Sequence, residues 1–200
     1  MNRRLTPVRG LAFALGAIGA VLIGSAAYIP AKAALAQVLL ERAWAKARAG
    51  EESAKPWPWA DITPIAKLEI PRLDRRAIVL EGASGAAMAF GPGHMENTPK
   101  IGSHGTAIVA AHRDTDFEFL GELSAGDRIV AVTTDGRRHL FKMVEARIVR
   151  ADASGLDPEE AGPTGARLAL VTCYPFRGVL HSPLRYVVIA DRETEVSGKE

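Results

Sequence analysis

The chain has 200 residues, a near balance of 25 basic and 23 acidic side chains, and a formal net charge of +2. No basic stripe is interleaved with aromatic residues, which argues against nucleic acid as a partner. The single cysteine excludes an intramolecular disulfide and a zinc site built from several cysteines. The roughly 140 residues from Ile62 onward are enough for one domain with its own core.

The N-terminal region has the charge pattern of a membrane-anchored chain. Residues 1–10 include three arginines and no acid, and residues 11–29 form a charge-free run of 19 residues. A helix of that length covers about 28 Å, close to the hydrocarbon thickness of a bilayer. We expect a transmembrane signal anchor, although Ser25-Ala26-Ala27 would suit cleavage of a signal peptide. A first span usually leaves its N-terminus in the cytoplasm, so the following domain is expected beyond the cell inner membrane, in the periplasm or another extracytoplasmic space.

Residues 30–60 are expected to hold a second helical segment and a linker. From Ala33 to Arg48, apolar residues recur at helical spacing, which predicts an amphipathic helix. The run Pro56-Trp57-Pro58-Trp59 ends it, because consecutive X-Pro steps disfavour helix. Trp57 and Trp59 either lie at a membrane surface or pack on the domain, and the sequence leaves both open.

Residues 61–193 have the pattern of an all-β domain, and residues 194–200 form a polar tail. Short β-rich runs are separated by Gly, Pro and Asp turns, which is typical of a barrel or a sandwich. Asp135-Gly136 is a strong hairpin signal, and one short helix is expected around residues 83–90. The expected strands are residues 66–70, 77–80, 106–111, 128–134, 138–149, 168–172 and 186–190.

Three polar side chains stand at ends of these expected strands: His112, Cys173 and Arg185. A thiolate is the reactive form of cysteine, and nearby positive charge favours it. A histidine can return a proton to a leaving amine, and an arginine supplies fixed donors for the oxyanion of a tetrahedral intermediate. Neighbouring barrel strands would bring the three to one rim, so they are candidate catalytic residues.

Each of these residues also has a plain structural interpretation. A lone cysteine is often a small buried hydrophobe, and a histidine at a strand end often bonds to a loop. Arg185 has rivals for its role in Arg113, Arg177 and Arg192. The spacing of the three candidates is therefore weak support when taken alone.

The same segments resemble a known family, the sortases. Leu170-Val171-Thr172-Cys173 is similar to their threonine–cysteine signature, residues 110–115 to their histidine strand end, and residues 182–188 to the segment with their arginine. The continuation to Phe176 is most similar to class D sortases and the related sortases of Gram-negative bacteria. Residues 28–33 also resemble that Gram-negative group, so the similarity covers nearly the whole chain.

The resemblance implies an eight-stranded sortase β-barrel and a cysteine transpeptidase of the thiol-protease class. In that family a cysteine attacks the Thr–Gly carbonyl of an LPxTG-like sorting motif near the C-terminus of the substrate protein. A thioester forms, and an amine acceptor releases the product. Carried over, Cys173 is the nucleophile, His112 the general acid and then base, and Arg185 the oxyanion and positioning group. Further candidate substrate contacts are Thr172, Tyr174 and His181.

Two other functions stay open at this point. The first is an inert membrane-tethered barrel that binds peptides or proteins, with Cys173 buried. The second is a cysteine peptidase that passes the acyl group to water. No cofactor is expected, and no required metal, because histidine and acidic residues lack the spacing of common zinc or EF-hand sites.

Overall fold

The computed structural model describes residues 5–177 and 182–193. The chain divides into two compact units, one ending at Val38 and one beginning at Leu39. The long helix α1 (Leu5–Arg48) contributes to both. Among the described residues, we find no helix with both the length and the apolar character needed to cross a membrane.

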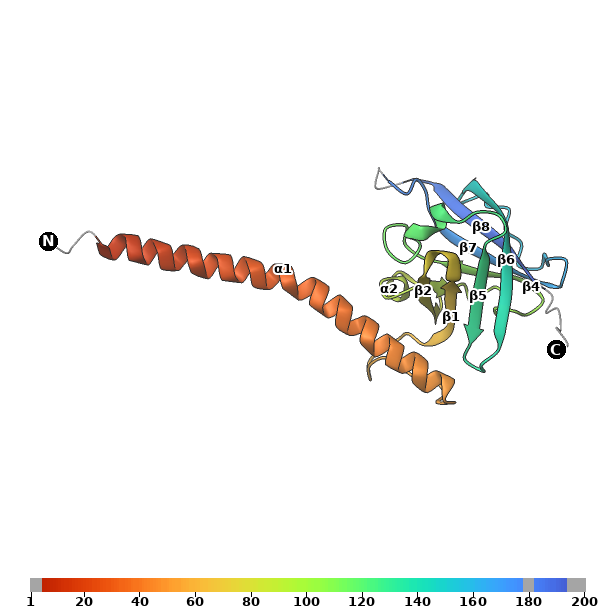
Figure 1. Ribbon diagram of the computed structural model, residues 1–200, viewed down its shortest axis with the longest axis horizontal. Coiled ribbons are helices and arrows are strands. Elements are labelled where there is room, and N and C mark those ends of the chain that lie inside the picture. Colours follow the sequence, from red (N-terminus) through yellow and green to blue (C-terminus); the bar gives the residue numbers. More distant parts are fainter. Residues whose placement is uncertain (1–4, 178–181, 194–200) are drawn as a thin grey trace. The chain divides into compact units, whose positions relative to one another are not determined.

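The second unit is a closed barrel of eight strands, as the resemblance implied (Figure 1). Its strands follow one another around the barrel in the order β1-β2-β3-β4-β7-β8-β6-β5. Most neighbours are antiparallel, but β4 pairs with β7, and β2 with β3, in parallel. The strands are β1 (Pro64–Ile70), β2 (Arg75–Glu81), β3 (Gly93–His94), β4 (Gly105–Ala110), β5 (Arg128–Thr133), β6 (Arg138–Arg150), β7 (Ala166–Cys173) and β8 (Leu184–Arg192).

All seven predicted strands are confirmed, each within two residues at either end. The hairpin at Asp135-Gly136 is present, with Gly136 at φ 88° in the left-handed region that glycine adopts without strain. The helix expected around residues 83–90 is a single turn, α2 (Gly85–Met88), capped by Ser84. Strand β3 was missed, because two residues are too short to show a period-2 pattern.

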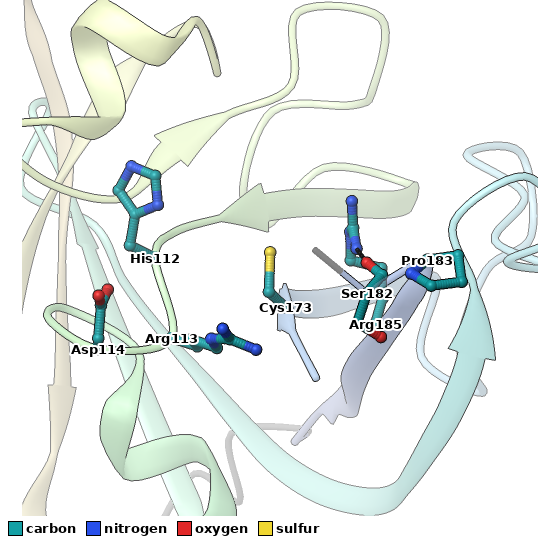
Figure 2. A pocket seen from close by; sticks show the side chains of 7 residues that line it. All are labelled: His112, Arg113, Asp114, Cys173, Ser182, Pro183 and Arg185. Atoms are coloured by element: carbon teal, nitrogen blue, oxygen red, sulfur yellow. Dashed lines mark hydrogen bonds between the residues drawn. The ribbon is translucent and has the colours of Figure 1, made fainter. Parts of the chain in front are cut away.

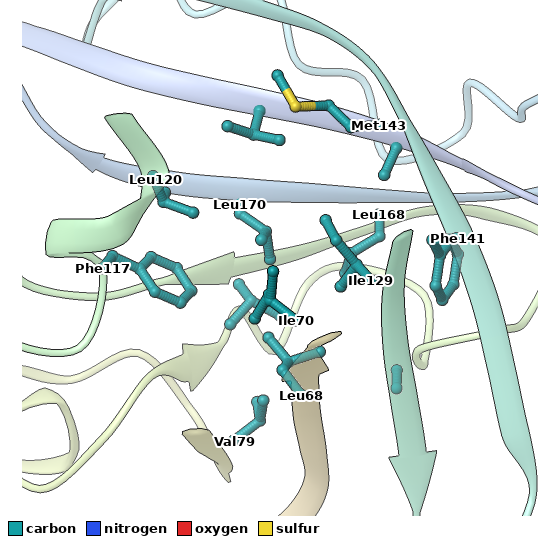
Figure 3. Packing of buried hydrophobic residues seen from close by; sticks show 14 of the residues in the cluster. Leu68, Ile70, Val79, Phe117, Leu120, Ile129, Phe141, Met143, Leu168 and Leu170 are labelled. Atoms are coloured by element: carbon teal, nitrogen blue, oxygen red, sulfur yellow. The ribbon is translucent and has the colours of Figure 1, made fainter. Parts of the chain in front are cut away.

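Alternation along the strands fills the barrel interior. In β1 every second residue is buried, and three of these, Ala66, Leu68 and Ile70, belong to the interior core (Figure 3). The short helix η2 (Glu118–Glu122) and the residue before it add two aromatic rings to this core, Phe117 at 0 % exposure and Phe119 at 4 %. The largest fully buried interior side chains are Phe117, Phe141, Leu68, Ile70, Leu120, Ile129, Leu168 and Leu170.

A second core lies outside the barrel, where the end of α1 packs on β2 and β5. Leu40 and Trp44 are buried there against Ile78, Leu80 and Val132, whose side chains point outward from the strands. The salt bridge from Lys67 to Glu41, 3.0 Å long, ties the same segment to β1. The end of the amphipathic helix is thus part of the folded domain rather than of a linker.

The two tryptophans of the Pro-Trp-Pro-Trp run have different surroundings. Trp57 packs on Phe90, with ring centroids 5.1 Å apart, and joins the outer core. Trp59 is 82 % exposed. Of the two arrangements left open by the sequence, packing on the domain therefore holds for Trp57.

An ion pair at the start of β5 makes stability depend on pH. Both oxygens of Asp127 accept hydrogen bonds from Arg72, at 2.5 and 2.6 Å, and the backbone N–H of Ser124 adds a third. The Arg72 hydrogen bond is the main reason that the pKa of Asp127 lies below its ordinary value. This stabilisation is therefore present above the unfolded-state pKa of about 4 and is lost as the pH falls through the lower folded-state pKa.

We therefore expect Asp127→Asn to be less stable than the wild type at pH 7 and to lose this part of the acid dependence. Unfolding by urea at pH 7 and at pH 3 measures both effects. The difference in free energy of unfolding between the wild type and Asp127→Asn should be smaller at pH 3 than at pH 7. Asp152→Asn is the control, because Asp152 and its partner Arg150 are both largely exposed and such pairs contribute little. An equal difference in free energy of unfolding at both pH values would contradict the assignment of this pH-dependent stabilisation to Asp127.

Candidate active site

The pairing of three strands brings the candidate residues to one end of the barrel. Strands β4 and β7 are parallel and in register up to Ala110 and Val171, so both end at the same rim. His112 follows the first of these strands and Cys173 ends the second. Strand β8 runs antiparallel to β7, and its register sets Arg185 directly opposite Cys173.

All three side chains line one cavity of about 560 Å³ at this rim. Figure 2 shows Cys173 in the middle, with His112 to one side and Arg185 to the other. The cavity is lined by His112, Arg113, Asp114, Cys173, Ser182, Pro183 and Arg185.

Cys173 is half-buried and its thiol is free. Its sulfur faces the cavity (Figure 2), in contrast to the buried cysteine that an inert binding module would have. His112 is exposed, so its imidazole can exchange protons with substrate or water. Access to the thiol and a neighbouring imidazole are the requirements for a cysteine nucleophile.

The guanidinium of Arg185 is held by backbone carbonyls at and just before the start of β8. Its Nη1 donates to the carbonyl of Ser182 at 3.0 Å and to that of Leu184 at 2.9 Å. Among the described residues, its Nε and Nη2 have no hydrogen-bond acceptor. A group fixed at one nitrogen and open at the others is suited to binding a carbonyl oxygen or an oxyanion.

Thr172 does not line the cavity, although it was a candidate substrate contact. Its side chain is 2 % exposed, and its hydroxyl donates to the carbonyl of Ala111 at 2.8 Å. The backbone N–H of Ala111 in turn donates to Val171. Thr172 therefore fixes the residue before His112 to the residue before Cys173.

Comparison with known proteins identifies the family of this fold and site. The sortase domain family matches residues 68–193. The chain belongs to the sortase family. Sortase D of Bacillus subtilis (strain 168) is 30 % identical over 132 residues, which is 64 % of this chain and 63 % of that protein. The chain thus spans about 63 % of the length of that curated relative.

Two solved sortase structures have a similar fold. The catalytic domain of B. anthracis SrtD is 30 % identical, with a TM-score of 0.53 over 66 % of this chain and 88 % of that one. A point mutant of sortase E from Streptomyces avermitilis is 29 % identical, with a TM-score of 0.54 over 68 % and 94 % of the two chains. Together, the B. subtilis relative and the B. anthracis SrtD domain identify this chain as a class D-like sortase.

We expect Thr172→Val to weaken this sortase even though the threonine does not face the cavity. Valine has nearly the same shape but leaves the buried carbonyl of Ala111 without its hydroxyl donor, at a cost of about 1–3 kcal/mol. The shift in the backbone next to His112 should lower turnover of a sorting peptide about 10-fold. Thr134→Val, beyond the end of β5, is the control, and equal turnover in the two variants would contradict this role.

Two of the three arginines that rivalled Arg185 lie outside the cavity. Arg192 lies at the other end of β8 and donates to the carbonyl of Gly102 at 3.2 Å. Arg177 is exposed and does not line the cavity. Arg113 does line it, and its Nη1 donates to the carbonyl of Pro175 at 2.6 Å. Sequence reasoning had weighed Arg113 only as an alternative to Arg185.

Tyr174 belongs to an aromatic cluster beside the cavity. Its ring stacks on Tyr186 with centroids 6.2 Å apart, and both rings make edge contacts with Phe176. Burial, followed by the charge of Tyr174, raises the pKa of Tyr186. Tyr174 is not among the residues lining the cavity, and His181, the remaining candidate contact, lies outside the described residues.

The loop after His112 carries two carboxylates with different surroundings. Asp114 lines the cavity and is exposed. Burial raises the pKa of Asp116, while a hydrogen bond from Thr115 and the charge of His112 act in the opposite direction. Asp116, a residue that the sequence pattern did not single out, thus lies close enough to His112 to feel its charge.

Within the part of the chain that the structure describes, no group of three histidine, cysteine or acidic residues is arranged to hold a metal ion.

Proposed function

We propose that this sortase is a cysteine transpeptidase that joins a substrate protein with an LPxTG-like C-terminal sorting signal to an amine acceptor. The observation that carries the proposal is the single cavity lined by Cys173, His112 and Arg185 in a sortase-family barrel. The sulfur attacks the carbonyl carbon of the scissile peptide bond, and donors of Arg185 stabilise the oxygen that becomes negative. His112 gives a proton to the leaving amine as the thioester forms.

The second half of the reaction reverses these proton transfers. The acceptor amine attacks the thioester, and His112 removes its proton as the new amide forms and the thiolate of Cys173 leaves. Water in place of the amine gives a carboxylic acid, so a hydrolase would use the same residues. The two outcomes differ only in the acceptor.

The test is incubation of the purified protein with an LPxTG-like peptide, with and without an added amine such as hydroxylamine or an oligoglycine. We expect a thioester on Cys173 by mass spectrometry and the amide product when the amine is present. The free acid as the sole product in both reactions would favour a hydrolase. Neither product nor thioester across a panel of sorting peptides would contradict the proposal.

A membrane anchor at residues 11–29 is part of the same proposal, with residues 1–10 in the cytoplasm and the barrel outside the inner membrane. The run without charge, preceded by three arginines, supports it. Several large apolar side chains of this run are exposed on α1, among them Phe13 at 82 % and Leu22 at 62 %, and a bilayer would cover them. Alkaline extraction of membranes is the test: the full chain should stay in the pellet, whereas Ile18→Arg should reduce this fraction. Complete release of the wild type would contradict the anchor.

A further inference from the structure

Two hydrogen bonds bracket the reacting side chains. On one side, the hydroxyl of Thr172 is bonded to Ala111, the residue before His112. On the other side, Arg113, the residue after His112, is bonded to Pro175, two residues after Cys173. His112 and Cys173 thus lie between two links that join the same two segments.

The second link begins where regular pairing between these segments ends. The backbone ladder between β4 and β7 has its last bond at Ala111, so the loop that carries His112 leaves the sheet there. Arg113 restores a connection beyond that point, with Nη1 2.6 Å from the carbonyl of Pro175. A charged donor to a carbonyl is among the stronger hydrogen bonds, and the planar guanidinium gives it a fixed direction.

We propose that Arg113 is a positioning residue that holds the loop of His112 against the segment after Cys173. Without this link, the loop is held at Ala111 and again at Phe117, whose N–H donates to the carbonyl of His112 and whose ring is fully buried. The bond to the His112 carbonyl lies within the loop, so without the bond to Pro175 the loop is no longer tied to the segment after Cys173, and the imidazole could shift relative to the thiol. A misplacement of about 1 Å between reacting groups can lower a rate by about 100-fold.

Arg113 also lines the cavity beside Cys173, as Figure 2 shows. Its hydrogen bond to Pro175 holds the segment that carries the thiol as well as the loop of His112. Loss of this bond therefore predicts a loss of thiol reactivity as well as of turnover when Arg113 is replaced. Because the chain has one cysteine, alkylation reports on Cys173 alone.

The experiment compares the wild type with Arg113→Met and with the control Arg177→Met, an exposed arginine in the segment after Cys173. Three quantities are measured: thermal stability, the rate of alkylation by a haloacetamide at pH 7, and kcat and KM for a sorting peptide with an amine. For Arg113→Met we expect a kcat about 10- to 100-fold lower with KM within about two-fold, and alkylation at least about three-fold slower. Arg177→Met should match the wild type in all three.

A kcat and an alkylation rate within about two-fold of the wild type in Arg113→Met would overturn the proposal, as would equal losses in Arg177→Met. If Arg113→Met does not fold, Arg113→Gln, which is too short to reach Pro175, is judged by the same thresholds. The inference rests on the proposed function, but alkylation needs no sorting peptide. A wild type that is alkylated but turns over no peptide would contradict the proposed function, and the alkylation rates alone would then decide the role of Arg113.

Discussion

Replacing Cys173 with alanine is expected to abolish the thioester and to lower turnover of a sorting peptide by at least about 10⁴-fold. The thiol is the one cysteine in the chain and faces the cavity, so no other sulfur can replace it as the nucleophile. Loss of a nucleophile or its base removes most of the chemical rate in comparable enzymes, and what remains comes from binding and oxyanion stabilisation. Product formation by chromatography and the intact mass of the protein after incubation measure the two effects.

The matched test of the same site compares two exposed histidines. His112→Ala should lower kcat by about 10²- to 10⁴-fold, because it removes the proton donor to the leaving amine. His104→Ala should leave kcat unchanged, because His104 lies in the loop before β4, at the opposite end of that strand from the cavity. Residual turnover by Cys173→Ala at wild-type level, or equal losses in the two histidine variants, would contradict the assignment.

The second large effect concerns stability. We expect Trp44→Ala to lower the free energy of unfolding by about 3–5 kcal/mol, the usual cost of removing a buried large aromatic side chain. Trp44 is 8 % exposed and packs in the outer core with Leu40 and Ile78. The loss would show that the end of α1 stabilises the barrel, whereas a linker would tolerate the change. Urea unfolding followed by far-UV circular dichroism is the measurement.

Trp59→Ala is the control for this prediction. Trp59 is 82 % exposed, so its removal should change the free energy of unfolding by less than about 0.5 kcal/mol. Similar unfolding curves for the two tryptophan variants would mean that the helix end contributes little to the folded domain.

Local pattern was sufficient for most of the fold. Alternation in residues 66–70 predicted β1, and Asp135-Gly136 predicted the hairpin between β5 and β6, because side-chain period and turn preference act over a few residues. The end of the amphipathic helix at Arg48 was also predicted from the sequence. The burial of this helix end could not be predicted, because its partners on β2 and β5 lie far away in the chain.

Part of the candidate site could be predicted from the sequence. His112, Cys173 and Arg185 were selected because each stands at a strand end and has a side chain suited to one catalytic step, and the structure brings them to one cavity. The resemblance to sortases made Thr172 a candidate substrate contact, and the structure shows its hydroxyl bonded to Ala111 inside the fold. A hydroxyl beside a nucleophile has the same sequence pattern whether it faces the substrate or the backbone.

The sequence by itself determined the all-β domain, the chemistry available at its strand ends and the likeness to sortases, since these follow from residue type and short spacing. The tertiary structure decided which ends meet. The parallel pairing of β4 with β7 joins residues about sixty positions apart, and the links from Thr172 to Ala111 and from Arg113 to Pro175 exist because of that pairing. Hydrogen bonds of this kind depend on the register of distant strands, which no local pattern specifies.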